Sequence, residues 1–305
     1  MNERLISDSL SFRIMHLTLL RNLRTAAISA LLALGGCGLF GGDEPEPPVD
    51  ACPREDLPSR ELVGAFLRQP EGVGLFEVLA VEGRASRSGA VRRLWLDDYT
   101  FKARAGDDGG LDGRRGARAE PIPGLAIPAA GASAFTVGYR SDGTAYTGRL
   151  AIGKPTPGSR LPSNGQVRYQ GPARLTVQAA APAAPVEVAG TAILDVGFGS
   201  RQATMTITAA AGALPFSRIE WTGIGMCGPR LGSTGQGGFR TTGVDGRAVS
   251  FVGPGDGAPG GSAMVNATFY GVEKAAGRPA GISGVLLIQG DSGVISGIFA
   301  VSPEP

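Results

Sequence analysis

The sequence predicts an all-β protein, with a C-terminal eight-stranded antiparallel β-barrel behind a smaller N-terminal β-rich region that carries one short helix. Two observations predict this class. The chain is rich in turn formers, with 49 Gly and 22 Pro in 305 residues, and its apolar residues repeat at every second position over much of its length. Aromatic residues make up only 6%, so Val, Leu, Ile and Ala must fill the core.

Residues 1–36 are predicted to be a lipoprotein signal peptide. A basic stretch around Arg21 precedes an apolar run over 26–34, which is too short to span a bilayer as a helix but suits a secretory signal. The run ends in LGGC, which resembles a bacterial lipobox. In such precursors the Cys is acylated with palmitate-type chains and becomes the mature N-terminus. We therefore expect cleavage between Gly36 and Cys37, lipidation of Cys37 and anchoring in the outer membrane.

The start of translation stays open between Met1 and Met15. Glu3 and Asp8 are unusual ahead of such a signal, so Met15 would give the more compact leader. The only histidine, His16, lies in this segment in either case.

Composition excludes several classes of function for the mature chain. Without an imidazole it lacks Ser-His-Asp and Cys-His catalysis and histidine ligation of a metal or haem. It also lacks a nucleotide-binding loop and a Cys-x-x-Cys pair, so we predict no catalytic residues, no metal site and no cofactor. Removing residues 1–36 leaves as many acidic as basic residues, and hence no net basic field to attract nucleic acid or anionic lipid.

Two segments precede the barrel. Residues 37–58 are rich in Gly, Pro and acidic residues and are predicted to form a flexible tether. Residues 59–160 are predicted to form a handle-like β-rich region, with Ser59 capping a short helix that ends at Pro70. Beyond the helix the pattern has period two, and Ser141-Asp142-Gly143 predicts a hairpin turn.

Residues 161–305 are predicted to form the barrel. In the segment after Gly165, Tyr169, Leu175 and Val177 share one face, while the alternate positions are polar. About nine such runs follow one another, of which eight would close a barrel just filled by its own side chains. An open sandwich is the alternative. The polar positions are mainly Thr, Gln and Arg, so the outer face is expected to meet water rather than lipid.

Three segments carry a resemblance to a known family. The first has a Pro-x-x-Gly-x-x-x-Tyr-x-Gly pattern, the second is GTAILDVGFGS (190–200), and the third contains a Phe-Tyr-Gly motif. The matching residues are Pro162, Gly165, Tyr169, Gly171, Phe269, Tyr270 and Gly271. These segments resemble the barrel domain of transferrin-binding protein B and related surface lipoproteins. The resemblance implies a barrel in which these residues are structural, and a single barrel is expected here.

The resemblance also implies a tethered binding protein rather than an enzyme. Recognition is expected through loops at one barrel end, such as 105–116 and 253–261, together with the N-terminal region. The ligand, a solute or a host protein, is unknown, and iron or haem acquisition is a family-level expectation. A passive envelope module and a periplasmic accessory to an outer-membrane transporter remain alternatives.

Cys52 and Cys227 are the only cysteines besides Cys37. Export would place them in an oxidising compartment, where we predict that they form a disulfide. Two unpaired thiols are the alternative.

Overall fold

The computed structural model describes residues 61–71, 76–86, 90–97, 99–104, 109–179, 184–209, 216–234, 239–243, 262–290 and 293–304. These residues belong to one compact unit, Cys52–Pro305; a second unit, Met1–Ala51, lies outside the described ranges. The described ranges are mostly strand, with three short 3-10 helices, η1 (Arg114–Gly116), η2 (Pro128–Ala130) and η3 (Gly158–Arg160). No helix in these ranges has the length and hydropathy to cross a bilayer.

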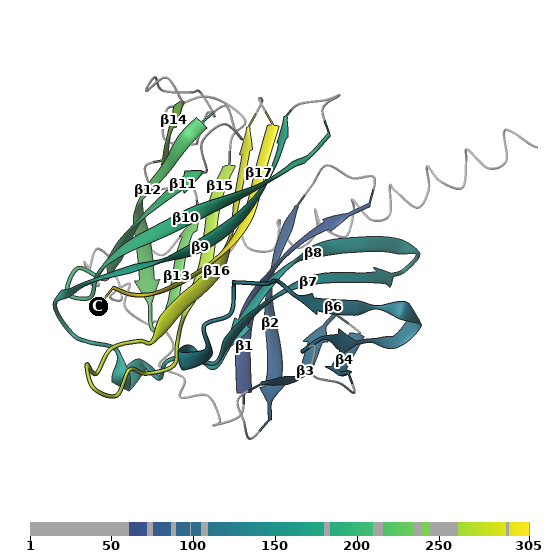
Figure 1. Cartoon of the computed structure of the whole chain (residues 1–305), viewed down its shortest axis with the longest axis horizontal. Helices are drawn as coiled ribbons and strands as arrows, with labels where there is room; N and C mark the ends of the chain where they lie inside the picture. The colour runs from purple at the N-terminus through teal and green to yellow at the C-terminus, as the bar shows by residue number, and fades with distance from the viewer. Residues whose placement is uncertain are drawn as a thin grey trace, which may run out of the picture. The chain divides into compact units, whose positions relative to one another are not determined.

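The first eight strands form a closed antiparallel barrel, in which each strand pairs with its neighbour in sequence and β8 pairs with β1 (Figure 1). They are β1 (Glu61–Pro70), β2 (Glu77–Ala85), β3 (Val91–Leu96), β4 (Tyr99–Ala103), β5 (Leu111–Asp112), β6 (Arg118–Pro121), β7 (Ala132–Ser141) and β8 (Thr144–Gly153). Asp142 and Gly143 form the two-residue turn between β7 and β8 with φ of 50° and 82°. This confirms the predicted hairpin.

The second sheet also closes into a ring of eight, because β11 pairs with β12. Its strands are β9 (Gln166–Ala179), β10 (Val186–Gly197), β11 (Gln202–Ala209), β12 (Phe216–Cys227), β13 (Arg230–Thr234), β14 (Phe239–Gly243), β15 (Ser262–Tyr270), β16 (Gly281–Gly290) and β17 (Gly293–Pro303). β13 pairs with residues 225–227 of β12, and β14 pairs with residues 216–221 of the same strand. β13 and β14 therefore follow β12 as one interrupted strand.

The predicted C-terminal barrel is confirmed, but the prediction of a single barrel is wrong. The N-terminal region is itself an eight-stranded barrel. The strands from β3 to β6 are short, with only two residues in β5 and four in β6, and η1 and η2 follow β5 and β6. Strands of two to six residues are too short to show a repeated alternation of apolar and polar residues. The sequence pattern therefore did not predict that this sheet closes.

The predicted helix after Ser59 is also wrong, because the residues after position 60 form β1. Leu62 and Phe66 point into the first barrel, whereas Ala65 and Leu67 point outward and are buried against the second. A strand buried on both faces has a nearly continuous apolar sequence. Apolar residues three and four positions apart then occur by chance, and this spacing imitates the apolar face of a helix.

The predicted alternation is confirmed along β9, where Tyr169, Leu175 and Val177 are buried and Arg168 and Arg174 between them are exposed. The outer face of this strand therefore meets water, as expected. The outer faces of β16 and β17 do not.

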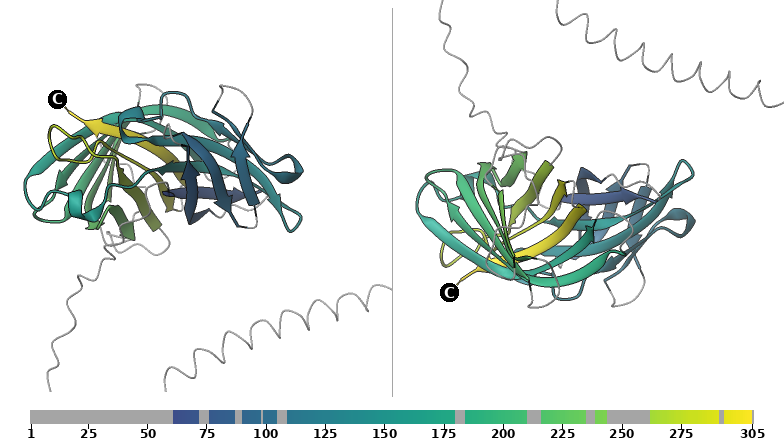
Figure 2. Two further views of the ribbon diagram at one scale, coloured as in Figure 1. Left: turned by 90° about the horizontal axis from the view of Figure 1, so that it is seen from below. Right: turned by 90° about the horizontal axis from the view of Figure 1, so that it is seen from above.

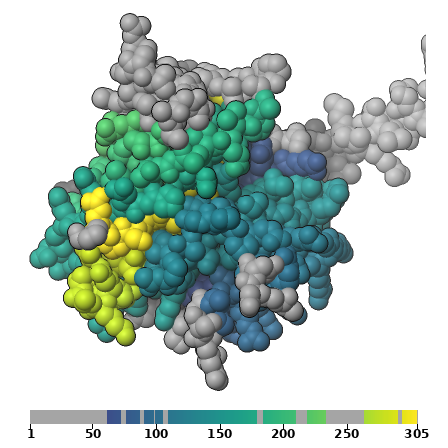
Figure 3. Space-filling view, viewed as in Figure 1, coloured from purple at the N-terminus to yellow at the C-terminus, as the bar shows by residue number. Residues whose placement is uncertain are grey.

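The outward side chains of β16 and β17 are buried against the first barrel. The cluster between the barrels comprises Ala65, Leu67, Leu125, Ile127, Ala130, Ala132, Ala134, Ala151, Tyr270, Ala280, Val285, Leu287, Ile298 and Ala300. Figure 2 separates the purple-to-teal strands of the first barrel from the teal-to-yellow strands of the second. In Figure 3, atoms of the first barrel lie directly against those of the second. Small alanine side chains on the first barrel permit this close packing.

Candidate functional site at the far end of the barrels

The two barrels lie alongside one another with corresponding ends together. The Tyr270 hydroxyl, at the end of β15, donates a hydrogen bond to the Val63 carbonyl at the start of β1 (3.2 Å). Further along, Arg149 of β8 donates to the Thr176 hydroxyl of β9 (2.6 Å). We call the end with Val63 and Tyr270 the near end, and the end where β1 and β9 finish the far end.

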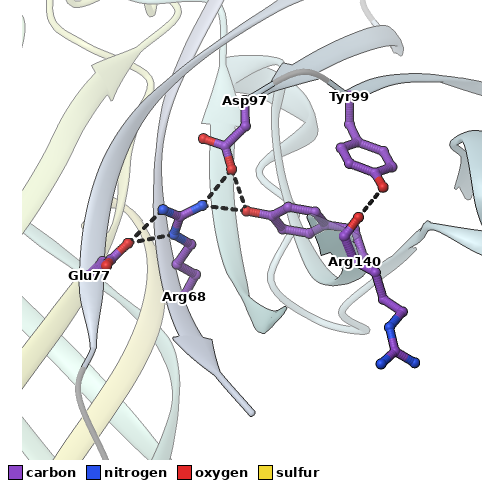
Figure 4. A network of polar contacts seen from close by, with 6 residues as sticks. Arg68, Glu77, Asp97, Tyr99 and Arg140 are labelled. Carbon is purple, nitrogen blue, oxygen red and sulfur yellow. Dashed lines mark hydrogen bonds and ion pairs between the residues drawn. The ribbon is translucent and has the colours of Figure 1, made fainter. Parts of the chain in front are cut away.

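A network of charged and phenolic groups surrounds Arg68 at the far end of the first barrel (Figure 4). The guanidinium lies 2.6 Å from a Glu77 carboxylate oxygen. Its Nη1 donates to Asp97 Oδ2 (2.5 Å) and to the Tyr139 hydroxyl (2.6 Å). The Tyr139 hydroxyl in turn donates to the same Asp97 oxygen (2.8 Å). Only 13% of the Arg68 side chain is exposed, so these partners take the place of water.

Three tyrosines surround this ion-pair cluster. The Arg68 guanidinium carbon lies 4.5 Å from the centroid of the Tyr146 ring, a cation–π distance. Tyr139 stacks on Tyr146 with ring centroids 5.2 Å apart, and Tyr99 lies 5.3 Å from Tyr139. The Tyr99 hydroxyl donates to the Arg140 carbonyl (Figure 4). These contacts fix the ring orientations at the barrel mouth.

Burial and pairing shift the pKa values in this network. Burial raises the pKa of Tyr139 above its usual value, and the neighbouring Asp97 carboxylate raises it further. Burial alone would lower the pKa of Arg68, but hydrogen bonds to Tyr139 and Glu77 and the charge of Asp97 raise it. At neutral pH the network therefore holds a fixed cation and a neutral phenol.

A second buried arginine joins the barrels toward the same end. Arg149 donates to the Arg174 carbonyl (2.8 Å) and to Glu187 Oε1 (2.5 Å), besides its bond to Thr176. Burial lowers the pKa of Arg149, and the Glu187 carboxylate offsets part of that shift. A single side chain of the first barrel thus satisfies acceptors on two strands of the second.

A groove of about 460 Å³ runs between the barrels beside Arg149, and Leu67 and Gln69 line it from the outer face of β1. Leu67, Phe76, Ile122 and Val294 supply apolar walls, and Gln178 supplies an amide. Outside the groove, Val186 is one of two large apolar side chains that are conspicuously exposed among the described residues, at 49%. Apolar walls with a few polar groups are typical of a binding surface.

At the far end, the Tyr139 hydroxyl donates to Asp97 and accepts from Arg68. Burial and the Asp97 carboxylate raise the pKa of Tyr139, so this hydroxyl stays protonated at neutral pH. Within the described ranges, no three His, Cys, Asp or Glu side chains form a group that could hold a metal ion. The arrangement suits recognition through rigid aromatic and charged groups.

The first family motif lies at the near end of the second barrel. Pro162 and Gly165 precede β9, and the Gly165 carbonyl accepts from the Phe198 amide (3.0 Å). Tyr169 is fully buried in the barrel core, and its hydroxyl lies 3.4 Å from the Pro279 carbonyl. A Cβ at Gly171 would lie 2.2 Å from the Ala300 carbonyl oxygen, so β17 passes too close for a side chain.

The Phe-Tyr-Gly motif joins the two barrels, a role that the sequence analysis missed. Phe269 packs inside the second barrel, but Tyr270 points outward into the cluster between the barrels. Gly271 has φ of +60°, and a Cβ there would lie 2.7 Å from the Cα of Ala130. Glycine adopts this backbone conformation without strain, and its lack of a Cβ permits the close approach to Ala130.

Other predicted site residues lie outside the described ranges or at their edge. Gly36, Cys37 and Cys52 fall outside them, as does the 253–261 loop. Cys227 ends β12 at the near end, where the adjoining Pro229 carbonyl accepts from the Phe269 amide (2.8 Å). The lipidation and the disulfide remain predictions.

The sequence analysis also missed Arg68 and Arg149. Arg68 was assigned to a helix, which hid its position at a barrel mouth. One signal was available: a two-residue turn at Asp142-Gly143 necessarily places Tyr139 opposite Tyr146, as observed. That pair could have been predicted as an aromatic cluster.

Two closed antiparallel barrels packed along one side define the class of this fold. The chain is similar to solved structures of transferrin binding protein B (TbpB). A TbpB point mutant from Haemophilus parasuis matches with 13% identity and a TM-score of 0.49, over 80% of this chain and 45% of that chain. The isotype 1 TbpB from serogroup B Neisseria meningitidis matches with 15% identity and a TM-score of 0.47, over 79% and 44%. No protein-family model matches, and no curated protein does.

The resemblance expected from the sequence is thereby confirmed as a likeness of fold. This chain spans less than half the length of these TbpB structures. At these identities and TM-scores, no ligand or partner follows from the likeness.

Proposed function

We propose that this chain is a non-catalytic lipoprotein, anchored in the outer membrane through Cys37, that binds a solute or a host protein with its far end. The observation that carries the proposal is that the entry of the chain and the candidate site lie at opposite ends of the described unit. The chain enters the first barrel at Glu61, at the near end, whereas Arg68, its tyrosines and the groove lie toward the far end. A tether attached at the near end would leave the far end accessible to a ligand.

Tyr146 is half-buried at this mouth, and its contacts with Tyr139 and Arg68 hold it in place, so it favours recognition of a protein surface. Tyrosine and arginine are enriched among the residues that contribute most to protein–protein binding. Iron or haem acquisition is the biological setting that the family resemblance suggests. Direct haem binding is not expected, because the mature chain has no histidine and Tyr169 is packed inside the second barrel.

Fractionation tests the anchor. Cys37→Ser should leave the uncleaved precursor or release the protein into the soluble fraction, since one or more acyl chains would be lost. A processed Cys37→Ser protein that still pellets with membranes would contradict the anchor. Protease shaving of intact cells then separates a surface position from a periplasmic accessory role.

Two further measurements test the remaining claims. The purified protein should show no haem absorbance band after haem addition and desalting; a stoichiometric band lost in Tyr169→Phe would indicate an internal pocket instead. Non-reducing mass spectrometry should find the peptides of Cys52 and Cys227 linked. The turn after Cys227 lies at the near end, the same end at which the chain enters β1 at Glu61, and this supports the pairing.

A further inference from the structure

We propose that a basic cavity at the near end binds the phosphate groups of anionic lipid headgroups in the membrane that carries the anchor. The linker between β8 and β9 and the loop after β15 face each other across a hollow of about 910 Å³. Both segments lie at the lower left of Figure 1, and yellow-green atoms of the loop form the lower left edge of the face in Figure 3.

The charged lining of this cavity has one sign. Lys154, Arg160 and Lys274 line it, and no carboxylate is among its described lining residues. None of the three forms an ion pair with a described residue, and all three are exposed. The nearby Glu273 carboxylate is engaged by Arg278 at 2.6 Å. Three unpaired cations repel one another, and an anion between them would relieve that repulsion.

The side-chain types suit phosphate. The chain has only three lysines, and two of them lie here. An ammonium group binds phosphate as a compact point charge, while a guanidinium can bind two of its oxygens together. The hydroxyl groups of Ser159 and Ser163 also lie in the lining and can donate hydrogen bonds.

The cavity walls are held in place before any ligand binds. The Thr156 amide donates to the Phe269 carbonyl (2.8 Å), and its hydroxyl donates to the Gly271 carbonyl (2.6 Å). The Gly271 amide donates back to the Lys154 carbonyl (3.1 Å). Thr156 is fully buried, so these bonds fix the linker against the loop. A preformed site avoids an ordering cost on binding.

Position favours lipid headgroups as the source of phosphate, and this step rests on the proposed anchor. Gly153, which precedes Lys154, pairs with Val63 near the start of β1. If residues 37–58 form the flexible tether that the sequence predicts, an unstructured chain from Cys37 to Glu61 would span roughly 27 Å. The tether would then keep the cavity close to the bilayer surface, where each cation strengthens association with anionic lipid roughly fivefold.

Amine labelling tests the proposal, because Lys102 on β4 lies outside the cavity and serves as an internal reference. The full lipidated chain is reconstituted in vesicles of phosphatidylcholine alone or with phosphatidylglycerol, then treated with an acylating reagent and analysed by mass spectrometry. We expect labelling of Lys154 and Lys274, relative to Lys102, to fall at least fivefold in the anionic vesicles only. Equal labelling in the two vesicle types would overturn the proposal.

A matched pair of variants tests the role of the cavity. Arg160→Ala keeps both lysine reporters and should reduce their protection several-fold. Arg92→Ala removes the same charge from an exposed position on β3 and should leave protection unchanged. Equal effects of the two variants would mean that net charge alone is sensed, contrary to the proposal.

A control with inorganic phosphate distinguishes a lipid headgroup from a free anion as the ligand of the cavity. Protection of both lysines by millimolar phosphate without vesicles, and none by anionic vesicles, would assign the cavity to a free anion and overturn the membrane assignment. Flotation of the protein with neutral vesicles measures attachment through the lipid anchor independently of the cavity. A chain that does not float, yet whose lysines anionic vesicles protect, would refute the anchor and keep the cavity.

Discussion

The two barrels have the same number of strands but differ in what lies inside them toward the far end. The second barrel contains a core cluster of aliphatic and aromatic residues, including Phe299 and Trp221. The first has a smaller apolar core and adds Tyr99, Tyr139 and the Arg68 network at its mouth. The second barrel is thus built for packing, and the first combines packing with a fixed set of polar groups. The proposed recognition at the far end depends on this fixed set of polar groups in the first barrel.

The largest expected effect comes from truncating a large buried side chain in the core of either barrel. Phe66→Ala in the first barrel and Phe299→Ala in the second should each lower the free energy of unfolding by about 3–5 kcal/mol, because both side chains are fully buried. Since a shared apolar cluster joins the barrels, we expect each change to destabilise both barrels.

The two tryptophans allow that expectation to be measured. Trp95 lies in the first barrel and Trp221 in the second, so Trp95→Phe and Trp221→Phe backgrounds each leave one reporter. Urea unfolding followed by fluorescence should give coincident transitions in the two backgrounds. Separate midpoints would show that the barrels unfold independently.

The contact at Gly271 provides the next largest effect. Gly271→Ala should cost about 2–4 kcal/mol, combining left-handed strain with a clash against Ala130. Gly277→Ala is the matched control, since Gly277 has φ of +62° but a methyl group there would meet no atom within 4 Å, and should cost only about 1–2 kcal/mol. Equal costs in thermal or urea unfolding would mean that the barrels do not press together there.

Removing one phenol from each barrel compares their polar groups. Tyr139→Phe should cost about 1–2 kcal/mol, because Arg68 and Asp97 each lose a close partner. Tyr169→Phe should cost less than about 1 kcal/mol, because the contact of its hydroxyl with the Pro279 carbonyl is 3.4 Å long. The reverse order in urea unfolding would contradict the assignment of the first barrel as the polar one.

The smallest effect concerns alkaline pH. Burial raises the pKa values of Tyr139, Tyr169 and Tyr270, so each stays protonated in the fold while it ionises in the unfolded chain at about pH 10. Stability should therefore be independent of these groups below that pH and fall as pH rises above it. Up to about pH 10.5 each contributes less than about 1 kcal/mol, measured as a flatter pH profile for the corresponding Phe variant. An unchanged profile would contradict their burial as neutral phenols.

Sequence patterns predicted the second barrel because most of its strands face water on one side. In β9 and β11 the alternation of apolar and polar residues is plain, and the chain folds accordingly. In β1 and β16 both faces are buried, so the alternation disappears and the partner surface was not predictable. The Arg68 network depended on contacts across positions 68, 97 and 139, which no local pattern encodes.

The opposition of the two ends determines how the molecule would carry mechanical load. A ligand held at the far end and an anchor at the near end would pull the first barrel along its strands. β1 is bonded on one side to β2 and on the other to β8, and those hydrogen bonds run across the pulling direction. They would be loaded in shear and must break together, whereas a strand peeled from one end loses its bonds singly. A tether attached to β1, as proposed, would therefore load the hydrogen bonds of that strand on both sides at once.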